Sequence, residues 1–269
     1  MAARTRRSRD PEGRMSLGQH LVELRKRLTR GALAVVAGTV GGWFLYDLIW
    51  PQITNPISHI AAAQGATEDQ IARIALNYTG ITGAFDVRIQ IALAVGIVIS
   101  SPIWLYQIFA FLVPGLTRRE KRYTFGFFFS AVPLFIGGVA AGWFVLPHIV
   151  EIMYSFVPKG STTFFETKTY LDFVLKLVLA TGIAFVLPVF LVLLNFIGVL
   201  QARTILKGWR WAILAITIFT AIATPAADVI SMILLAIPMI ALYFAAVGVA
   251  LVHDRGVQRR AQALEAELA

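Results

Sequence analysis

Six long apolar runs constrain this chain more than any other feature of its sequence. About 20 apolar residues in a helix cross the roughly 30 Å hydrocarbon core of a bilayer, and all but one of the runs reach that length. The runs therefore predict an all-α, polytopic membrane protein with six transmembrane helices. They cover residues 31–50, 89–113, 123–146, 173–200, 211–224 and 229–252.

Composition excludes several other classes of protein. Only 14% of the residues are charged, against about 25% in soluble domains. The chain has no cysteine and its four histidines are scattered, so the sequence predicts no metal site and no cofactor. No phosphate-binding loop and no Ser-, His- or zinc-based catalytic motif occurs, so the chain is predicted not to be an enzyme.

The basic residues predict the orientation of the chain. Of the 24 Lys and Arg residues, 19 fall on one side if the N-terminus is cytoplasmic: before the first run and within 118–122, 203–210 and 255–260. This positive-inside asymmetry predicts that both ends are cytoplasmic, in the cell (inner) membrane. Because the net charge of +9 lies in clusters between apolar runs, it indicates contact with membrane lipid and not nucleic acid.

The domain organisation follows from the same runs. Residues 1–14 are predicted to be a disordered basic extension, 15–255 the six-helix transmembrane domain, and 256–269 a cytoplasmic C-terminal tail. The first outer loop is predicted to start at Pro51. Leucines at helical spacing in 17–28 predict an amphipathic helix along the cytoplasmic surface.

Prolines and one short run predict a bent bundle. Pro102, Pro133, Pro147, Pro188 and Pro238 lie in or beside the runs, and each removes a backbone donor and bends its helix. We expect a bent, concave bundle with short fifth and sixth helices, whose concave face opens to lipid near the first outer loop and the short fifth helix. The fifth run, 211–224, would span only about 21 Å. Its start could be misplaced. Alternatively, the bilayer thins there, or Asp228 is drawn below the outer surface.

Two acidic residues stand out among the cytoplasmic bases. Glu23 lies four residues before Arg27, and Glu120 is the only acid in the basic segment 118–122. Each could simply neutralise its neighbours; Glu23 could do so through an ordinary i,i+4 pair with Arg27. Alternatively, the two acids could dock an incoming cation, which arginine would provide through bidentate hydrogen bonds.

One basic residue of the fourth run is also unusual. Lys176 follows Asp172 by four residues near the outer edge of that run. A charge in a span is costly and often functional. The simpler interpretation is an Asp172–Lys176 ion pair with both ends reaching the surface.

Several segments together resemble one family. Residues 20–28, His-Leu-Val-Glu-Leu-Arg-Lys-Arg-Leu, resemble the N-terminal motif of TatC, the twin-arginine protein translocase subunit. The second run from Ser101-Pro102 to Pro114-Gly115-Leu116, leading into Glu120, is also similar. So are Phe185 with Pro188, Thr224-Pro225 with Asp228 and Ser231, and the segment ending at Pro238. The resemblance covers 15–255 in order.

The resemblance implies a function. TatC proteins recognise the arginine pair of signal peptides on folded precursor proteins at the cytoplasmic face. They assemble with single-span partner subunits, in a working complex expected to be oligomeric, for export driven by the proton-motive force. The alternative that the residues leave open is a secondary transporter of a small solute or ion.

The resemblance also implies site residues. The signal-peptide-binding residues it implies are Glu23, Glu120, Arg25 and Phe111, and the structural or partner-contact residues are Pro56, Pro188, Asp228 and Val186. Val186 is a departure, because the family usually has a glutamate at this place in the fourth helix. Met232 similarly stands where the family has a glutamine.

Overall fold

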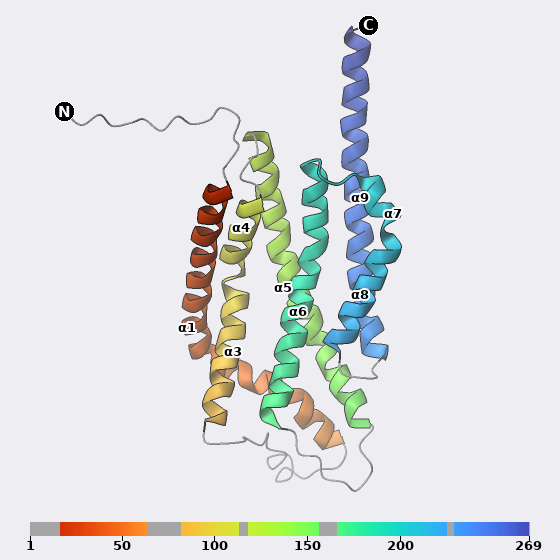
Figure 1. The fold of residues 1–269 in the computed structure, drawn as a ribbon. Coiled ribbons are helices and arrows are strands. Elements are labelled where there is room, and N and C mark those ends of the chain that lie inside the picture. Colours follow the sequence, from red (N-terminus) through yellow and green to blue (C-terminus); the bar gives the residue numbers. More distant parts are fainter. Residues whose placement is uncertain (1–16, 64–81, 113–117, 156–165, 225–228, 269) are drawn as a thin grey trace, which may run out of the picture.

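The fold is known from a computed structural model that describes residues 17–63, 82–112, 118–155, 166–224 and 229–268, leaving out the side chains at 17, 57–63, 112, 118–125, 154 and 268. Every element in these ranges is a helix (Figure 1). In chain order the helices are α1 (Leu17–Ala63), α3 (Gly83–Ile99), α4 (Ser101–Leu112), α5 (Arg118–Ser155), α6 (Thr167–Phe196), α7 (Ala202–Lys207), α8 (Trp209–Ala223) and α9 (Val229–Leu268).

The predicted apolar runs correspond to these helices. Four described helices, α1, α5, α6 and α9, contain a stretch long and apolar enough to cross a membrane. A fifth crossing results if α3 and α4 form one bent span. The all-α membrane class is therefore confirmed. A sixth crossing requires the shorter α8 to span, and this stays a prediction.

The axes of α3 and α4 differ by 58°. The two helices therefore meet at a sharp break. Pro102 has no N–H to continue the ladder. The indole Nε1 of Trp104 donates to the Ile97 carbonyl at 2.9 Å, so this carbonyl at the end of α3 is satisfied despite the break.

Helix α1 differs from the prediction at both ends. The segment 17–28 is not a separate surface helix but the start of the continuous α1. At the other end, the expected loop at Pro51 is wrong, because α1 passes through Pro51 and Pro56 to Ala63. The helix changes direction in this last part (Figure 1), as two missing donors within two turns allow. The Tyr170 hydroxyl donates to the carbonyl of Ile53 at 2.8 Å and holds this part of α1 on α6.

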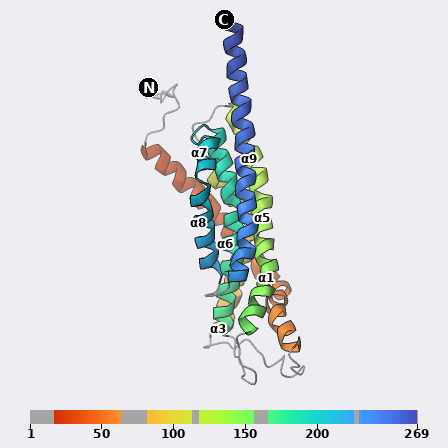
Figure 2. The same cartoon turned by 90° about the vertical axis from the view of Figure 1, so that its right-hand side faces the viewer.

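Helices α8 and α9 contrast in length. Helix α8 has 15 residues, or about 23 Å, so a misplaced start does not explain its shortness. The prediction of a short sixth helix is wrong, because α9 has 40 residues and continues as a helix through the predicted tail. Its last 13 residues contain no proline and are rich in Ala, Gln, Glu, Arg and Leu, which favour helix. This part rises beyond the other helices (Figures 1 and 2).

Glycines allow α1 to lie directly against α3. A Cβ on Gly38 would lie 2.5 Å from the Gly96 carbonyl oxygen, and one on Gly42 would meet the backbone of Ala92. Small residues four apart on both helices therefore face each other. Such seams let membrane helices approach closely enough for backbone van der Waals contact.

A second glycine seam joins α5 and α6. A Cβ on Gly138 would lie 2.5 Å from the Thr181 carbonyl oxygen and 2.9 Å from the Cα of Gly182. One turn later, Gly142 faces the side chain of Thr181. The neighbouring Gly137 has nothing within 4 Å of a Cβ position, so the seam is confined to one face of α5.

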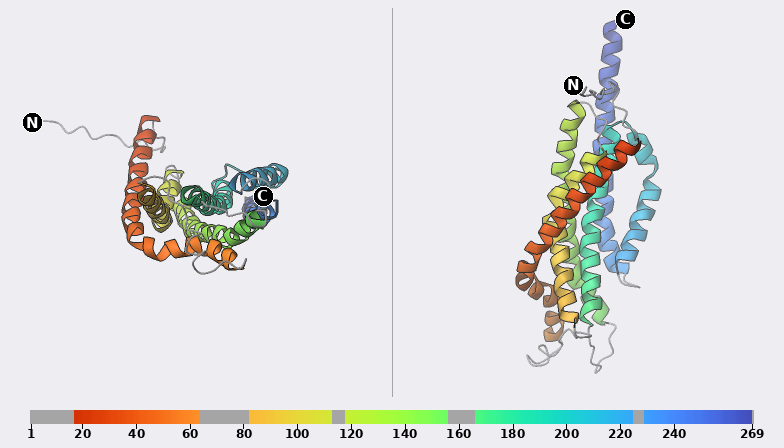
Figure 3. Two further views of the ribbon diagram at one scale, coloured as in Figure 1. Left: turned by 90° about the horizontal axis from the view of Figure 1, so that it is seen from below. Right: turned by 60° about the vertical axis from the view of Figure 1, so that its left-hand side comes forward.

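The helices form an open curve and not a closed bundle. Helix α1 packs on α3, α4 and α5, whereas α8 packs on α9, α6 and α7. Seen along its long axis, the molecule has α1 at one end of the curve and α8 with α9 at the other (Figure 3). This agrees with the bent arrangement predicted from the prolines. The opening to lipid near the first outer loop and the fifth helix stays a prediction, and residues 64–81 of that loop lie outside the described residues.

The basic segments share one end of the molecule. Helix α1 begins, α5 begins, α6 meets α7, and α9 ends at this end (Figure 1). We call it the inner end, and the opposite one the outer end, after the predicted orientation. The arrangement matches the pairing of segments that the basic residues predicted.

Candidate functional site

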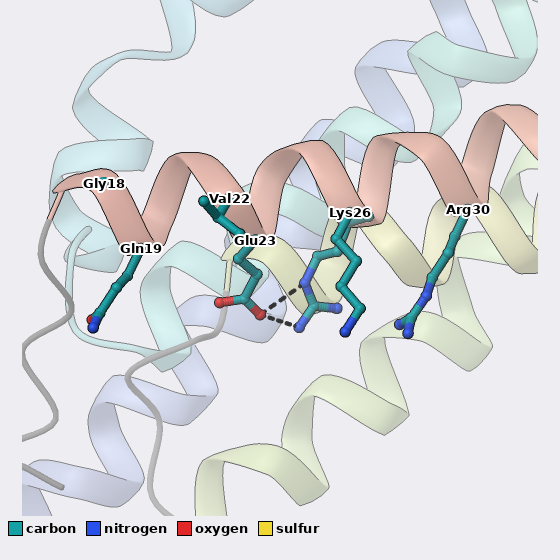
Figure 4. Close-up of a pocket in the computed structure, with 7 residues that line it drawn as sticks. Gly18, Gln19, Val22, Glu23, Lys26 and Arg30 are labelled. Carbon is teal, nitrogen blue, oxygen red and sulfur yellow. Dashed lines mark hydrogen bonds and ion pairs between the residues drawn. The ribbon is translucent and has the colours of Figure 1, made fainter. Parts of the chain in front are cut away.

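The inner end carries an open groove along one helix. Its volume is about 810 Å³. The side chains of α1 point into it along successive turns (Figure 4). Among the residues that the structure describes, its charged lining consists of one acid, Glu23, and three bases, Lys26, Arg27 and Arg30. Gly18, Gln19 and Val22 also line it.

Glu23 is partly buried and held by Arg27. The Nε and Nη2 atoms of Arg27 donate to the same carboxylate oxygen, Oε1, at 3.0 and 2.5 Å. The two side chains are only 21% and 22% exposed. The i,i+4 pair expected from the sequence therefore forms. Within the described ranges, the second oxygen Oε2 accepts no side-chain hydrogen bond, so it can accept one from another cation.

Helix α4 fixes the start of α1. The rings of His20 and Phe111 lie with centroids 4.5 Å apart and 30° between their planes. Phe111, implied by the resemblance, is thus brought beside the motif that contains Glu23. Arg25 is exposed and is not part of the groove lining.

Glu120 lies in the first turn of α5, which begins at Arg118 at the inner end (Figure 1). Helix α5 packs on both α1 and α4. The backbone therefore puts the two predicted acids at the same end of the molecule. The Glu120 side chain lies outside the described residues, so its distance from Glu23 stays a prediction.

The remaining implied residues lie away from the groove. Pro56 is buried in the last part of α1, and Pro188 lies in the interior of α6. Val186 is 3% exposed and packs with Leu105 and other core residues of α4 to α6. A buried valine here is a packing residue within this chain. Asp228 lies outside the described residues.

A second groove lies at the outer end between three helices. Its volume is about 880 Å³, and α5, α6 and α8 line it. Asp172 and Lys176 both face it, but the ion pair expected between them is absent from the described ion pairs. Pairing gains little for groups that can reach polar surroundings. No group of three or more His, Asp or Glu side chains in the described ranges could hold a metal ion.

Sequence reasoning missed a polar cluster that ties α9 to the α6–α7 turn. Asp254 accepts from the Asn195 amide at 2.9 Å and from the backbone N–H of Ala202 at 2.8 Å. It thereby caps α7 from another helix. His253 stacks on Phe196 with centroids 3.8 Å apart. Asn195, a buried amide at the end of an apolar run, was the signal that could have revealed this cluster.

Comparison with known proteins gives consistent results. The family model described as Sec-independent protein translocase protein (TatC) matches residues 19–238. A Sec-independent protein translocase protein TatC from Xylanimonas cellulosilytica is 49% identical over 247 residues, covering 92% of this chain and 87% of the relative. The protein of the same name from Rothia mucilaginosa is 35% identical, with 93% and 84% covered.

Solved structures agree with these relatives. A crystal structure of a twin arginine translocase receptor, TatC, is 28% identical and superimposes with a TM-score of 0.67, covering 87% of this chain and 98% of that one. A second, of the receptor in DDM, is 29% identical with a TM-score of 0.71, covering 86% and 99%. None of these comparisons supports transport of a small solute.

Proposed function

The chain belongs to the TatC family of Sec-independent protein translocases, and we propose that its inner end binds the arginine pair of twin-arginine signal peptides on folded cargo. In this proposal Glu23 and Glu120 each accept hydrogen bonds from one guanidinium group. The observation that carries the proposal is Glu23, an acid held in place at a groove whose other described charged residues are basic.

The geometry of Glu23 supports binding of a guanidinium group. Arg27 uses only Oε1, so it orients the carboxylate while Oε2 remains available. A partly buried carboxylate that is already oriented loses little side-chain entropy when it binds. Arginine offers five donors in a planar fork, whereas lysine offers a point charge. The site is therefore expected to prefer arginine to lysine.

The charges of the groove explain why a second acid is needed. In the described part of the lining, Lys26, Arg27 and Arg30 outnumber Glu23, so these four residues alone would repel a peptide with two positive charges. Glu120 is the acid that α5 brings to the same end. We infer that the bound peptide lies between the starts of α1 and α5.

The same proposal covers location and partners. The inner end, which carries the basic segments, faces the cytoplasm, and the protein lies in the inner membrane with six spans, of which α8 is the fifth in chain order. Single-span translocase subunits assemble with it, and the proton-motive force drives export. The working complex contains more than one copy of the chain.

A binding titration tests the site. The purified full-length chain in nanodiscs would be titrated with a fluorescent twin-arginine signal peptide, and with the same peptide carrying two lysines. We expect Glu23→Gln and Glu120→Gln each to weaken binding of the arginine peptide at least about tenfold, or ~1.4 kcal/mol. The lysine peptide should bind the unmodified chain as weakly as the arginine peptide binds these variants.

The matched control is Glu267→Gln, which removes an exposed acid near the end of α9. It should bind the arginine peptide as the unmodified chain does. Equal affinities for the Glu23, Glu120 and Glu267 variants would refute the assigned site, even if the chain still exports cargo.

A further inference from the structure

We propose that the part of α9 beyond Asp254 pairs with the same segment of a second copy of this chain as a short parallel coiled coil. This inference concerns α9 alone and does not depend on the signal-peptide site. It starts from one face of α9 that is buried in the first half of the helix and exposed in the second.

The buried half of this face packs inside the chain. Tyr243, Val247 and Ala250 are 5%, 3% and 0% exposed and pack with Ala202 and Ile205 of α7. The Tyr243 hydroxyl also donates to the carbonyl of Ile205. Asp254, at the next position of the same face, caps α7. The alternating spacing of four and three residues is the spacing of a coiled-coil seam.

The same spacing continues past the last contact with α7. Val257, Ala261, Leu264 and Leu268 follow Asp254 at intervals of three, four, three and four residues. Val257 is 53% and Leu264 59% exposed. In Figures 1 and 2 this part of α9 extends past the other helices. The face that the protein covers up to Ala250 is thus uncovered beyond it.

A second copy fits this face better than an unrelated helix. Two copies in one membrane have the same orientation, so their α9 helices are necessarily parallel. In a parallel coiled coil, position g, directly before core position a, pairs with position e of the partner helix, five residues later in the sequence. Arg260 precedes the core position Ala261, and Glu265 follows the core position Leu264. Each copy therefore supplies the arginine of one Arg260–Glu265 ion pair and the glutamate of the other, so the two pairs are symmetric, as an isologous interface requires.

Tethering compensates for the short length of the segment. A seam of about two heptads would not hold two free peptides together, because isolated helices this short are marginal in water. Here α9 is already helical from Val229, which removes the cost of nucleation. Confinement to one membrane raises the effective concentration of the two segments.

Cysteine cross-linking tests the proposal directly, because the chain contains no cysteine. Leu264→Cys places a thiol on the seam, and Ala266→Cys places one on the opposite face of the same turn. Both full-length variants would be oxidised in native membranes. We expect disulfide-linked dimers from Leu264→Cys and at least about tenfold fewer from Ala266→Cys, since a disulfide needs Cα atoms within roughly 7 Å.

A charge exchange separates the proposed interface from chance collision. Adding Arg260→Glu to Leu264→Cys should reduce the dimer yield several-fold, and adding Glu265→Arg to that variant should restore it. Equal dimer yields from positions 264 and 266, no dimer from 264, or an adduct of Leu264→Cys with a different protein in place of the dimer would each overturn the proposal. Signal-peptide affinity, measured on the same variants, should not change.

Discussion

The two grooves of the molecule have similar volumes but different construction. The described lining of the inner groove of about 810 Å³ comes from α1, whereas that of the outer groove of about 880 Å³ comes from α5, α6 and α8. Each contains an acid followed four residues later by a base. Glu23 and Arg27 pair in the inner groove, but Asp172 and Lys176 do not pair in the outer one.

This difference shows what helical spacing decides and what it does not. Residues four apart on a helix are close enough to interact, so the spacing permits both pairs. The inner pair is partly buried on one helix face, where each charge loses solvent unless it is paired. In the outer groove, Lys176 is exposed and Asp172 partly exposed, so each can be satisfied without the other. Burial, which depends on the tertiary arrangement, decides whether the pair forms.

The largest effect on stability is expected at the glycine seam between α5 and α6, two of the helices that line the outer groove. Gly138→Leu would place a side chain against the backbone of Thr181 and Gly182 and force α5 away from α6. We expect it to lower stability in detergent by at least about 3 kcal/mol, the upper part of the range for overpacking. Thermal unfolding of the purified protein would measure this.

The adjacent residue provides the control for this prediction. Gly137→Leu adds the same side chain where nothing lies within 4 Å of the Cβ position, and it should leave the unfolding temperature nearly unchanged. If both variants are equally stable, the close approach of α5 and α6 is wrong.

An intermediate effect is expected from the hydrogen bond that joins α6 to the bent part of α1. Tyr170→Phe removes the donor to the Ile53 carbonyl and keeps the ring. Loss of one buried hydrogen bond should cost about 1 kcal/mol of stability. Tyr106→Phe, at a residue that is 43% exposed, should cost much less. A Tyr170→Phe variant as stable as Tyr106→Phe would contradict the contact.

The smallest effect distinguishes the two acid–base pairs themselves. A double-mutant cycle of Glu23→Gln with Arg27→Gln should give a coupling free energy of roughly 0.5–1 kcal/mol, because the pair is formed but close to the surface. The same cycle with Asp172→Asn and Lys176→Gln should give a value near zero. Equal coupling in the two cycles would remove the contrast between the grooves.

The sequence predicted the parts of the fold that depend on local pattern. Apolar length identified the helices, and the basic residues identified which segments share an end. The short α8 followed from the distance between Trp211 and Thr224. The unusual acid Glu23 stood out because its surroundings in the chain are basic.

The parts that sequence reasoning missed depend on contacts between distant segments. Helix α1 continues past Pro51, and the carbonyl of Ile53 in this part accepts a hydrogen bond from Tyr170, which lies 117 residues later in the chain. The glycines of both seams look alike in the sequence, and only the neighbouring helix distinguishes Gly138 from Gly137. In each case a local rule was overridden by a tertiary contact.

The central claim is that two acids at the inner end each bind one arginine of a signal peptide. The most direct measurement is a set of double-mutant cycles that combine Glu23→Gln or Glu120→Gln with replacement of either signal arginine by glutamine. We predict that each acid couples to one arginine by at least about 1.5 kcal/mol, as close charge pairs at interfaces do, and only weakly to the other. Additive effects in all four cycles would contradict the claim.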